Sequence, residues 1–216
     1  LLNMDCLLYM KQCEDKQFDL AIVDPPYGIG AGSKGFINRN TANKNAEKFY
    51  RNNDWDKVRP TKEYFDELRR ISKNQIVWGG NYFADLLPPK KGWIFWDKKI
   101  TNANNMNFSD GELAWTSIDG ILRRFTYDWI GFGYLNNPQK EKKIHPTQKP
   151  VQLYEWILDT YVKEGSKIID THLGSGSIAE ACWNRKFDLV GIEIDNEYFQ
   201  KASKRLEVHK KQLTLF

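Results

Sequence analysis

The stretch Leu20-Ala21-Ile22-Val23-Asp24-Pro25-Pro26-Tyr27 decides the fold of this 216-residue chain. Its first four residues form a short, continuously apolar run, which is typical of a strand buried on both faces of a parallel sheet. The two prolines end that strand, because proline has no backbone N–H donor and fixes its own φ angle. The sequence therefore predicts a rigid, extended tetrapeptide at the carboxyl edge of a sheet, where α/β proteins bind their ligands.

The tetrapeptide offers one carboxylate, carbonyl groups of fixed direction and one aromatic face. These groups suit an exocyclic amino group on a planar base. The Asp24 carboxylate and the Pro25 carbonyl would accept its two N–H groups, while Tyr27 stacks on the ring. The competing interpretation is a Pro-Pro turn capped by an aspartate, and the four residues alone do not separate the two.

A second strand, turn and helix pattern stands in the carboxyl-terminal half. The apolar segment 167–171 leads into His172-Leu173-Gly174-Ser175-Gly176-Ser177 and then into a helical stretch, 178–185. Glycines let a ligand approach the backbone, and a helix N-terminus offers free N–H groups to a carboxylate or phosphate. A third strand, 187–193, ends in Glu193, about 20 residues after the glycines, as a ribose-binding carboxylate does. The pattern indicates an adenosine-containing cofactor, with NAD and a purely structural βαβ unit as alternatives.

The hydrophobic pattern elsewhere completes an α/β arrangement. Apolar positions at helical spacing predict helices over 61–72, 151–162 and 197–209. Short apolar runs predict strands over 75–78, 93–96, 112–116 and 123–127.

Four motifs follow one another along the chain: Asp24-Pro25-Pro26-Tyr27, His145-Pro146-Thr147-Gln148-Lys149-Pro150, Asp170-Thr171-His172-Leu173-Gly174-Ser175-Gly176-Ser177 and Gly191-Ile192-Glu193-Ile194-Asp195. In this order they resemble the amino-methylating DNA methyltransferases. The chain is most similar to their circularly permuted β group, in which the catalytic tetrapeptide precedes the S-adenosylmethionine loop. Compact phage, prophage and restriction-modification members are the nearest in pattern. The resemblance covers residues 3–30 and 144–207.

The resemblance implies a Rossmann-like, S-adenosylmethionine-dependent α/β fold, mostly parallel with helices on both faces, in one domain spanning residues 1–216. It implies transfer of the methyl group of S-adenosylmethionine to N6 of adenine in a short double-stranded DNA site, by base flipping and direct in-line transfer. N4 of cytosine is the first alternative, since cytosine presents a similar amine. The others are methylation of RNA or a protein amide, a catalytically inactive nucleic-acid-binding protein of the same fold, and an NAD-dependent oxidoreductase.

The resemblance also implies which residues act. The expected catalytic residues are Asp24, Pro25, Pro26 and Tyr27. The expected cofactor-binding residues are Asp5, Cys6, His145, Thr147, Lys149, Asp170, Leu173, Gly174, Ser175, Gly176, Glu193 and Ile194. His172 departs from the aromatic or small residue expected beside the glycines. The histidines show no metal-ligand spacing, so we expect no metal.

Two segments are candidates for DNA recognition. Residues 28–60 are rich in glycine, asparagine and lysine and show little periodicity, which predicts a mobile lid or binding loop. The polar stretch 98–143 is the expected target-recognition insert. Its candidate DNA contacts are Lys98, Arg123, Arg124, Lys142 and Lys143 for phosphates, and Asn102, Asn104 and Asn105 for base edges.

Composition sets the remaining expectations. A formal net charge of +4 permits nucleic-acid binding but falls short of a strongly basic footprint. The cysteines Cys6, Cys13 and Cys182 show no disulfide framework, and no apolar run is long enough to span a membrane, so we expect a cytoplasmic protein. A homodimer and a cognate restriction endonuclease are further partners that the expected function allows.

Overall fold

Strand β2 (Phe18–Val23) lies inside the sheet because its side chains are apolar on both faces. Leu20 and Ile22 pack into one hydrophobic cluster, while Ala21 and Val23 pack into another on the opposite face. This is the alternation of a strand covered on both sides. The structure is a computed structural model that describes residues 1–30, 56–99, 109–129 and 144–213, and it confirms the predicted buried strand.

The described residues form an eight-stranded sheet in the order β1-β8-β7-β2-β3-β5-β4-β6. The other strands are β1 (Leu2–Asn3), β3 (Ser72–Trp78), β4 (Trp93–Asp97), β5 (Gly111–Thr116), β6 (Arg123–Thr126), β7 (Lys167–Asp170) and β8 (Asp188–Glu193). Strand β5 is antiparallel to both of its neighbours, and the other pairs are parallel. The predicted mostly parallel sheet is confirmed.

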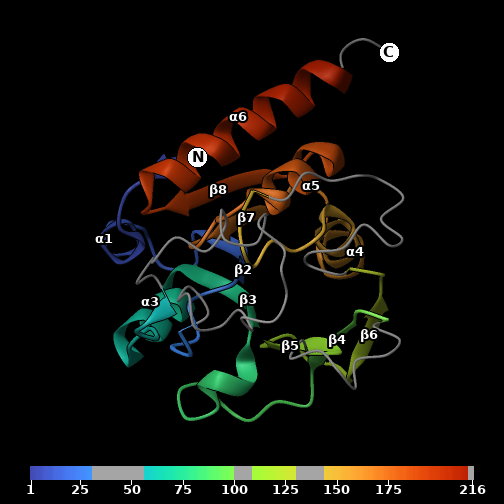
Figure 1. Cartoon of the computed structure of the whole chain (residues 1–216). Helices are drawn as coiled ribbons and strands as arrows, with labels where there is room; N and C mark the ends of the chain where they lie inside the picture. The colour runs from blue at the N-terminus through green and yellow to red at the C-terminus, as the bar shows by residue number, and fades with distance from the viewer. Residues whose placement is uncertain (31–55, 100–108, 130–143, 214–216) are drawn as a thin grey trace.

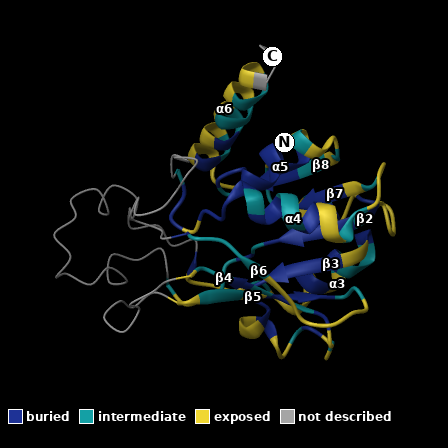
Figure 2. Ribbon diagram, turned by 90° about the vertical axis from the view of Figure 1, so that its right-hand side faces the viewer, coloured by how far each residue is buried: buried dark blue, intermediate teal, exposed yellow. Residues whose placement is uncertain are grey.

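Helices cover both faces of this sheet (Figures 1 and 2). One face carries α4 (Val151–Tyr161), α5 (Ser177–Arg185) and α6 (Asn196–Leu213). The opposite face carries α1 (Cys6–Met10), α3 (Lys62–Ile71) and the 3-10 helix η3 (Gly80–Phe83). The three-layer, Rossmann-like arrangement expected from the sequence is confirmed.

The predicted helices form close to their expected ends. Helix α3 buries Tyr64, Phe65, Leu68 and Ile71, the apolar positions whose spacing predicted it. Helix α6 begins after Asp195, whose carboxylate accepts the N–H groups of the next turn and caps the helix. It continues to residue 213, one turn beyond the predicted end.

The strand order reverses between β2 and β7, which are hydrogen-bonded neighbours. From β2 the chain moves on to β3 on one side, and from β7 it moves on to β8 on the other. Open α/β sheets bind ligands in the crevice at this point, beyond the carboxyl ends of the strands. The Asp24 tetrapeptide follows β2 and the glycine turn follows β7. The two loops therefore lie side by side at the carboxyl edge of the sheet.

Candidate active site

The Asp24 carboxylate has both oxygens engaged. The Tyr27 hydroxyl donates to its Oδ1 at 2.6 Å, and the Lys149 ammonium donates to its Oδ2 at 2.5 Å. The turn after the prolines is closed by Asp56, whose Oδ1 accepts the backbone N–H groups of Tyr27 and Gly28 at 2.6 and 3.0 Å. Hydrogen bonds therefore hold both the Asp24 carboxylate and the backbone of the turn that follows the prolines.

The Tyr27 ring is fixed by aromatic neighbours from η3. It stacks on Tyr82 with ring centroids 4.8 Å apart and meets Phe83 edge-on at 6.1 Å. Gly79 makes this possible, because a Cβ there would lie 2.2 Å from Cε1 of Tyr27. Burial raises the pKa of Tyr27 well above its usual range, and the nearby Asp24 carboxylate raises it further. The hydroxyl therefore stays protonated and remains a donor.

Lys149 lies against the Asp24 carboxylate. Its side chain is 3% exposed, and its ammonium also contacts Oε2 of Glu112 at 3.0 Å. The other Glu112 oxygen pairs with Lys98 at 2.6 Å. Burial lowers the pKa of Lys149, but Asp24 and Glu112 together raise it by more, so the ammonium stays charged. Burial raises the pKa of Glu112, and Lys149 and Lys98 outweigh this and bring it down to about 2.

The glycine turn after β7 is held by Glu193. Gly174 and Gly176 adopt left-handed backbone angles, with φ of +53° and +74°. The Glu193 carboxylate, at the end of β8, accepts the N–H groups of Gly174 and Asp195 at 2.8 and 2.9 Å. Leu173 and Ser175 are buried within the turn, and helix α5 starts directly after it. The turn is therefore pre-shaped with the first N–H groups of a helix at its end.

Asp170 is a buried carboxylate that no cation contacts within the described part of the chain. Its Oδ1 accepts the backbone N–H of His172 at 2.9 Å. Burial raises the pKa of Asp170 to about 8, and the carboxylates of Asp24 and Glu193 contribute in the same direction. The Asp170 carboxyl is therefore largely protonated at pH 7, and positive charge placed beside it would favour its ionised form. A ligand that carries cationic groups fits such a site.

The remaining expected cofactor residues border the same turn. Asp5 caps α1 by accepting the N–H of Leu8 at 2.9 Å. Burial raises the pKa of the neighbouring Cys6 thiol to about 12, so it is not a nucleophile. Ile194 is exposed just beyond β8.

His145 packs edge-on against Tyr198, and its ring lies 3.8 Å from where a Cβ of Gly174 would be. Thr147 is exposed, with its hydroxyl 3.1 Å from Nδ1 of His145.

His172 has a structural explanation that the motif alone did not supply. Thr171 Oγ1 lies 2.9 Å from its Nδ1, and the Tyr64 hydroxyl lies 2.6 Å from the same Thr171 oxygen. The His172 and Tyr64 rings also meet edge-on at 5.4 Å. Burial lowers the pKa of His172 to about 4, so its imidazole is neutral at pH 7. Tyr64, from α3, thus supports His172 beside the glycines through the Thr171 hydroxyl and through its own ring.

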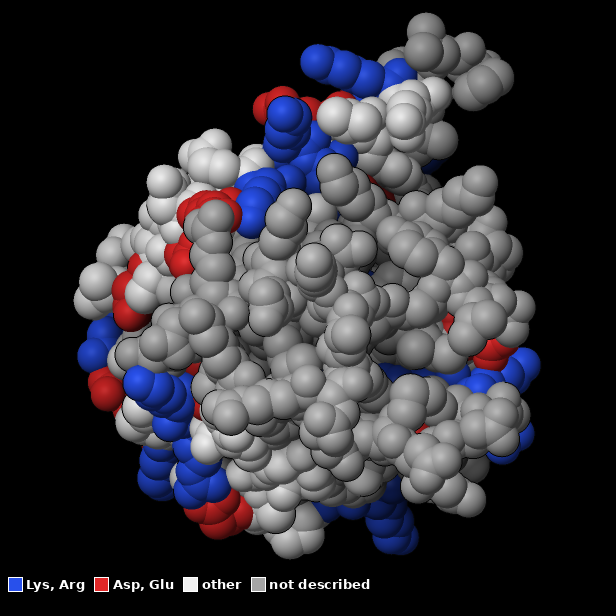
Figure 3. All heavy atoms as spheres, viewed as in Figure 1, with Lys and Arg blue, Asp and Glu red and all other residues white. Residues whose placement is uncertain are grey.

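The candidate DNA contacts are only partly described. Lys98 is paired with Glu112, and its side chain is 16% exposed. Arg123 and Arg124 are exposed on edge strand β6, opposite the first half of β4 and away from its carboxyl end. In the view of Figure 1, Figure 3 shows lysine and arginine side chains interspersed with acidic ones around the margin of the molecule. The other candidates, together with residues 31–55 of the predicted loop, lie outside the described residues: Asn102, Asn104, Asn105, Lys142 and Lys143.

Two further observations concern metals and membranes. Within residues 1–30, 56–99, 109–129 and 144–213, no group of three or more His, Cys, Asp or Glu is placed to hold a metal ion. In that same part of the chain, none of the helices has the length and apolar character needed to cross a bilayer.

Three features define the class of this protein: the sheet, the Asp24 carboxylate followed by two prolines, and the glycine turn. The class is that of the α/β, S-adenosylmethionine-dependent methyltransferase folds. Residues 90–204 match the family model described as DNA methylase, which joins N6 and N4 methyltransferases. This match spans more than half of the chain, and the chain therefore belongs to that DNA methylase family.

Similar proteins agree with this assignment. The Type II methyltransferase M2.DpnII of Streptococcus pneumoniae is 25% identical, over 96% of this chain and 89% of its own length. The crystal structure of the M1.HpyAVI complex with S-adenosylmethionine has a TM-score of 0.54 at 21% identity, covering 94% of this chain and 97% of that one. The cytosine-N4-specific PvuII DNA methyltransferase has a TM-score of 0.57 at 14% identity, covering 93% and 83%. The two solved structures share the fold.

Proposed function

We propose that this protein transfers the methyl group of S-adenosylmethionine to the N6 amino group of adenine in a short double-stranded DNA sequence. The observation that carries the proposal is the meeting of the Asp24 loop and the Asp170–Gly176 turn at one crevice. Methyl transfer needs the acceptor nitrogen within about 3–3.5 Å of the methyl carbon, so both sites must open at the same place.

The Asp24 loop is assigned to the acceptor. The N6 lone pair of adenine is delocalised into the ring, so the amine is a poor nucleophile. Hydrogen bonds from its two N–H groups to the Asp24 carboxylate and the Pro25 carbonyl favour a pyramidal nitrogen and stabilise its developing positive charge. The prolines, Asp56 and Tyr27 fix these acceptors in advance, which is electrostatic preorganisation. The Tyr27 ring, already stacked on Tyr82, is assigned to the flipped base.

The Asp170 turn is assigned to the cofactor. S-adenosylmethionine supplies an activated methyl group on a sulfonium, together with an ammonium. Its two cationic groups match the buried Asp170 carboxyl, which forms no ion pair among the described residues and whose ionised form they would favour. Glu193 is assigned to the ribose hydroxyls and Asp5 to the adenine amino group. Further residues assigned to the cofactor are Cys6, His145, Thr147, Leu173, Gly174, Ser175, Gly176 and Ile194.

The chain order supports a place in the permuted β group, because the acceptor loop after β2 precedes the cofactor loop after β7. We assign the whole activity to one domain spanning residues 1–216. The similarity to Type II methyltransferases such as M2.DpnII makes a cognate restriction endonuclease a reasonable partner.

Cytosine N4 is the second candidate for the target. The family includes N4 as well as N6 methyltransferases, and the PvuII enzyme with the same fold is cytosine-N4-specific. The aspartate at the head of the tetrapeptide favours adenine by resemblance, while the hydrogen-bonding argument applies to either amine.

Nucleoside analysis tests the proposal. Unmethylated duplex DNA is incubated with the protein and S-adenosylmethionine labelled in the methyl group, then digested to nucleosides and separated. We expect the label in N6-methyladenine, and none in a reaction with unlabelled cofactor. Label in N4-methylcytosine would show that the target base is cytosine and not adenine. Label in RNA or protein alone, or nowhere, would contradict the proposal.

A further inference from the structure

Four alternating charges run from Asp24 away from the crevice. The Lys149 ammonium bridges Asp24 and Glu112 at 2.5 and 3.0 Å, and Lys98 follows Glu112 at 2.6 Å. They come from four segments: the end of β2, the residue after β4, the start of β5 and the segment before α4. Because the tertiary fold brings these segments together, no local sequence motif assigns a role to Glu112.

The position of Lys149 is costly unless it has a task. An ammonium taken out of water loses several kcal/mol of hydration, and an apolar side chain of similar size often serves stability as well. Here the Lys149 side chain is 3% exposed. It is compensated by two carboxylates and by the face of Trp78, whose ring centroid is 5.2 Å from Nζ. A buried cation this well supported, in contact with the acceptor carboxylate, indicates a role at Asp24.

We propose that Lys149 is a positioning residue for methyl transfer: it holds a positive charge against Asp24 and fixes its Oδ2, while Glu112 holds the ammonium in place. The inference rests on the proposed role of Asp24 as acceptor of the target amine. It moves Lys149 from the cofactor, where the motif resemblance placed it, to the other side of the crevice.

The charges around Asp24 explain why the ammonium is needed. Without it, Asp24 and Glu112 would be two partly buried carboxylates, 17% and 26% exposed, near each other. Such a pair takes up a proton at higher pH than a single exposed carboxylate. A protonated carboxyl has one oxygen turned into a donor and accepts the amine poorly. Lys98 contacts Glu112 rather than Asp24. The other titratable groups that act on or respond to Asp24 bring no positive charge, being neutral hydroxyls or a further acid: Tyr27, Tyr64, Tyr154 and Asp170.

The test is a double-variant series with Lys149→Met, Glu112→Gln and the two combined. Single-turnover methyl transfer is measured from pH 6 to 9 at saturating DNA and cofactor, and cofactor affinity is measured by calorimetry. We expect Lys149→Met to lose about tenfold to a hundredfold in rate at pH 7, because two neighbouring carboxylates without the ammonium between them bind a proton more readily. The loss should shrink as pH rises, and cofactor affinity should stay near that of the parent.

The combined variant separates electrostatics from packing. Removing Glu112 as well eliminates the like charge, so the combined variant should recover about tenfold of the rate that Lys149→Met loses at pH 7. A pH-independent loss without recovery, or a weakened cofactor affinity, would overturn the inference and return Lys149 to the cofactor site. If Lys149→Met does not fold, the combined variant is compared with Glu112→Gln. The acid side of the pH–rate profile should then lie at higher pH in the combined variant, which lacks the lysine, than in Glu112→Gln.

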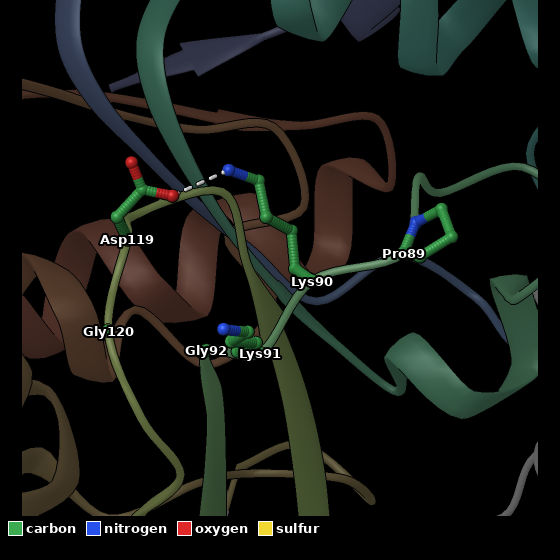
Figure 4. A pocket seen from close by; sticks show the side chains of 6 residues that line it. All are labelled: Pro89, Lys90, Lys91, Gly92, Asp119 and Gly120. Atoms are coloured by element: carbon green, nitrogen blue, oxygen red, sulfur yellow. Dashed lines mark hydrogen bonds and ion pairs between the residues drawn. The ribbon is translucent and has the colours of Figure 1, made fainter.

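Lys90→Met is the matched control. Lys90 pairs with Asp119 at 2.8 Å beside a hollow of about 460 Å³ lined also by Pro89, Lys91, Gly92 and Gly120 (Figure 4). This pair precedes β4 and follows β5, at the sheet edge opposite Asp24, so its loss should leave rate and pH profile unchanged. Asp24→Ala separates the two proposals: if it stays active, the assigned acceptor is wrong. If it is inactive while Lys149→Met keeps the parent's pH profile, only the present inference fails.

Discussion

At the scale of single residues, the space and charge around a position decide which residue type it can hold. Gly79 is an example, because its left-handed backbone and missing side chain allow the Tyr27 ring to reach Tyr82. Asp170 is another, because it is buried, forms no ion pair among the described residues and has a pKa of about 8. Both residues are explained by the ligands we propose rather than by stability alone.

Replacement of Gly79 should disable the acceptor side selectively. A Cβ there would lie 2.2 Å from the Tyr27 ring, so Gly79→Ala must displace either the ring or η3. We expect methyl transfer to fall by at least about tenfold, because a misplacement of about 1 Å has large effects on transfer rates. Rate measurements beside Gly120→Ala, where a Cβ meets nothing within 4 Å, provide the control. Equal rates in both variants would show that the Tyr27 position does not matter.

Cofactor affinity should depend on the ionisation of Asp170. The pKa of this carboxyl is about 8 in the free protein, and a cationic ligand favours its ionised form. Affinity for S-adenosylmethionine should therefore rise with pH up to about 8 and level off above it, with proton release on binding. Calorimetry across this range in Asp170→Asn separates the carboxyl from the titration of the cofactor's own amine. The same pH dependence in parent and variant would remove Asp170 from the site.

At the scale of elements, helix α6 braces the glycine turn that follows β7. The Arg205 guanidinium donates to the Ser175 carbonyl at 3.2 Å and to the Ser177 hydroxyl at 3.1 Å, and it pairs with Glu180 at 2.8 Å. The Arg205 and Glu180 side chains are only 14% and 9% exposed. One arginine therefore ties α6, the turn and α5 together.

Arg205→Met should weaken both the fold and the cofactor site. It leaves Glu180 buried without its partner, which costs about 3–5 kcal/mol of unfolding free energy. Cofactor affinity should fall as the turn loosens. Urea unfolding and calorimetry are compared with Arg185→Met, whose ion pairs are more exposed and should contribute only about 0–1 kcal/mol. Similar losses in the two variants would contradict the bracing role.

The elements that the sequence predicted well are those with local signals. Strand β2 and the turn after β7 are marked by apolar runs that end in prolines or glycines, and α3 by its four core positions. Glu112 and Tyr82 were missed as site residues because their places depend on β2, β3 and β5 being neighbours. Lys149 was recognised as a motif residue, yet its contact with Asp24 depends on the same tertiary arrangement.

At the scale of the whole molecule, the reversal of strand order between β2 and β7 brings the two proposed ligand sites together. The Asp24 loop stands on one side of the reversal and the Asp170–Gly176 turn on the other. Both loops follow buried strands and are held by side chains from several elements. The parallel centre of the sheet therefore supplies the rigid support that a methyl transfer between two bound molecules requires.

The most direct test of this arrangement is to measure transfer and cofactor binding in the same Asp24 variants. In Asp24→Ala we expect methyl transfer to duplex DNA to fall by at least about a thousandfold, since a preorganised acceptor is lost. Affinity for S-adenosylmethionine should stay within about threefold of the parent, as expected for a group on the acceptor side. Asp24→Asn, which keeps the size of the side chain, should also lose most of the transfer. Transfer within tenfold of the parent, or a matching loss of cofactor affinity, would contradict the division of the crevice into acceptor and cofactor sides.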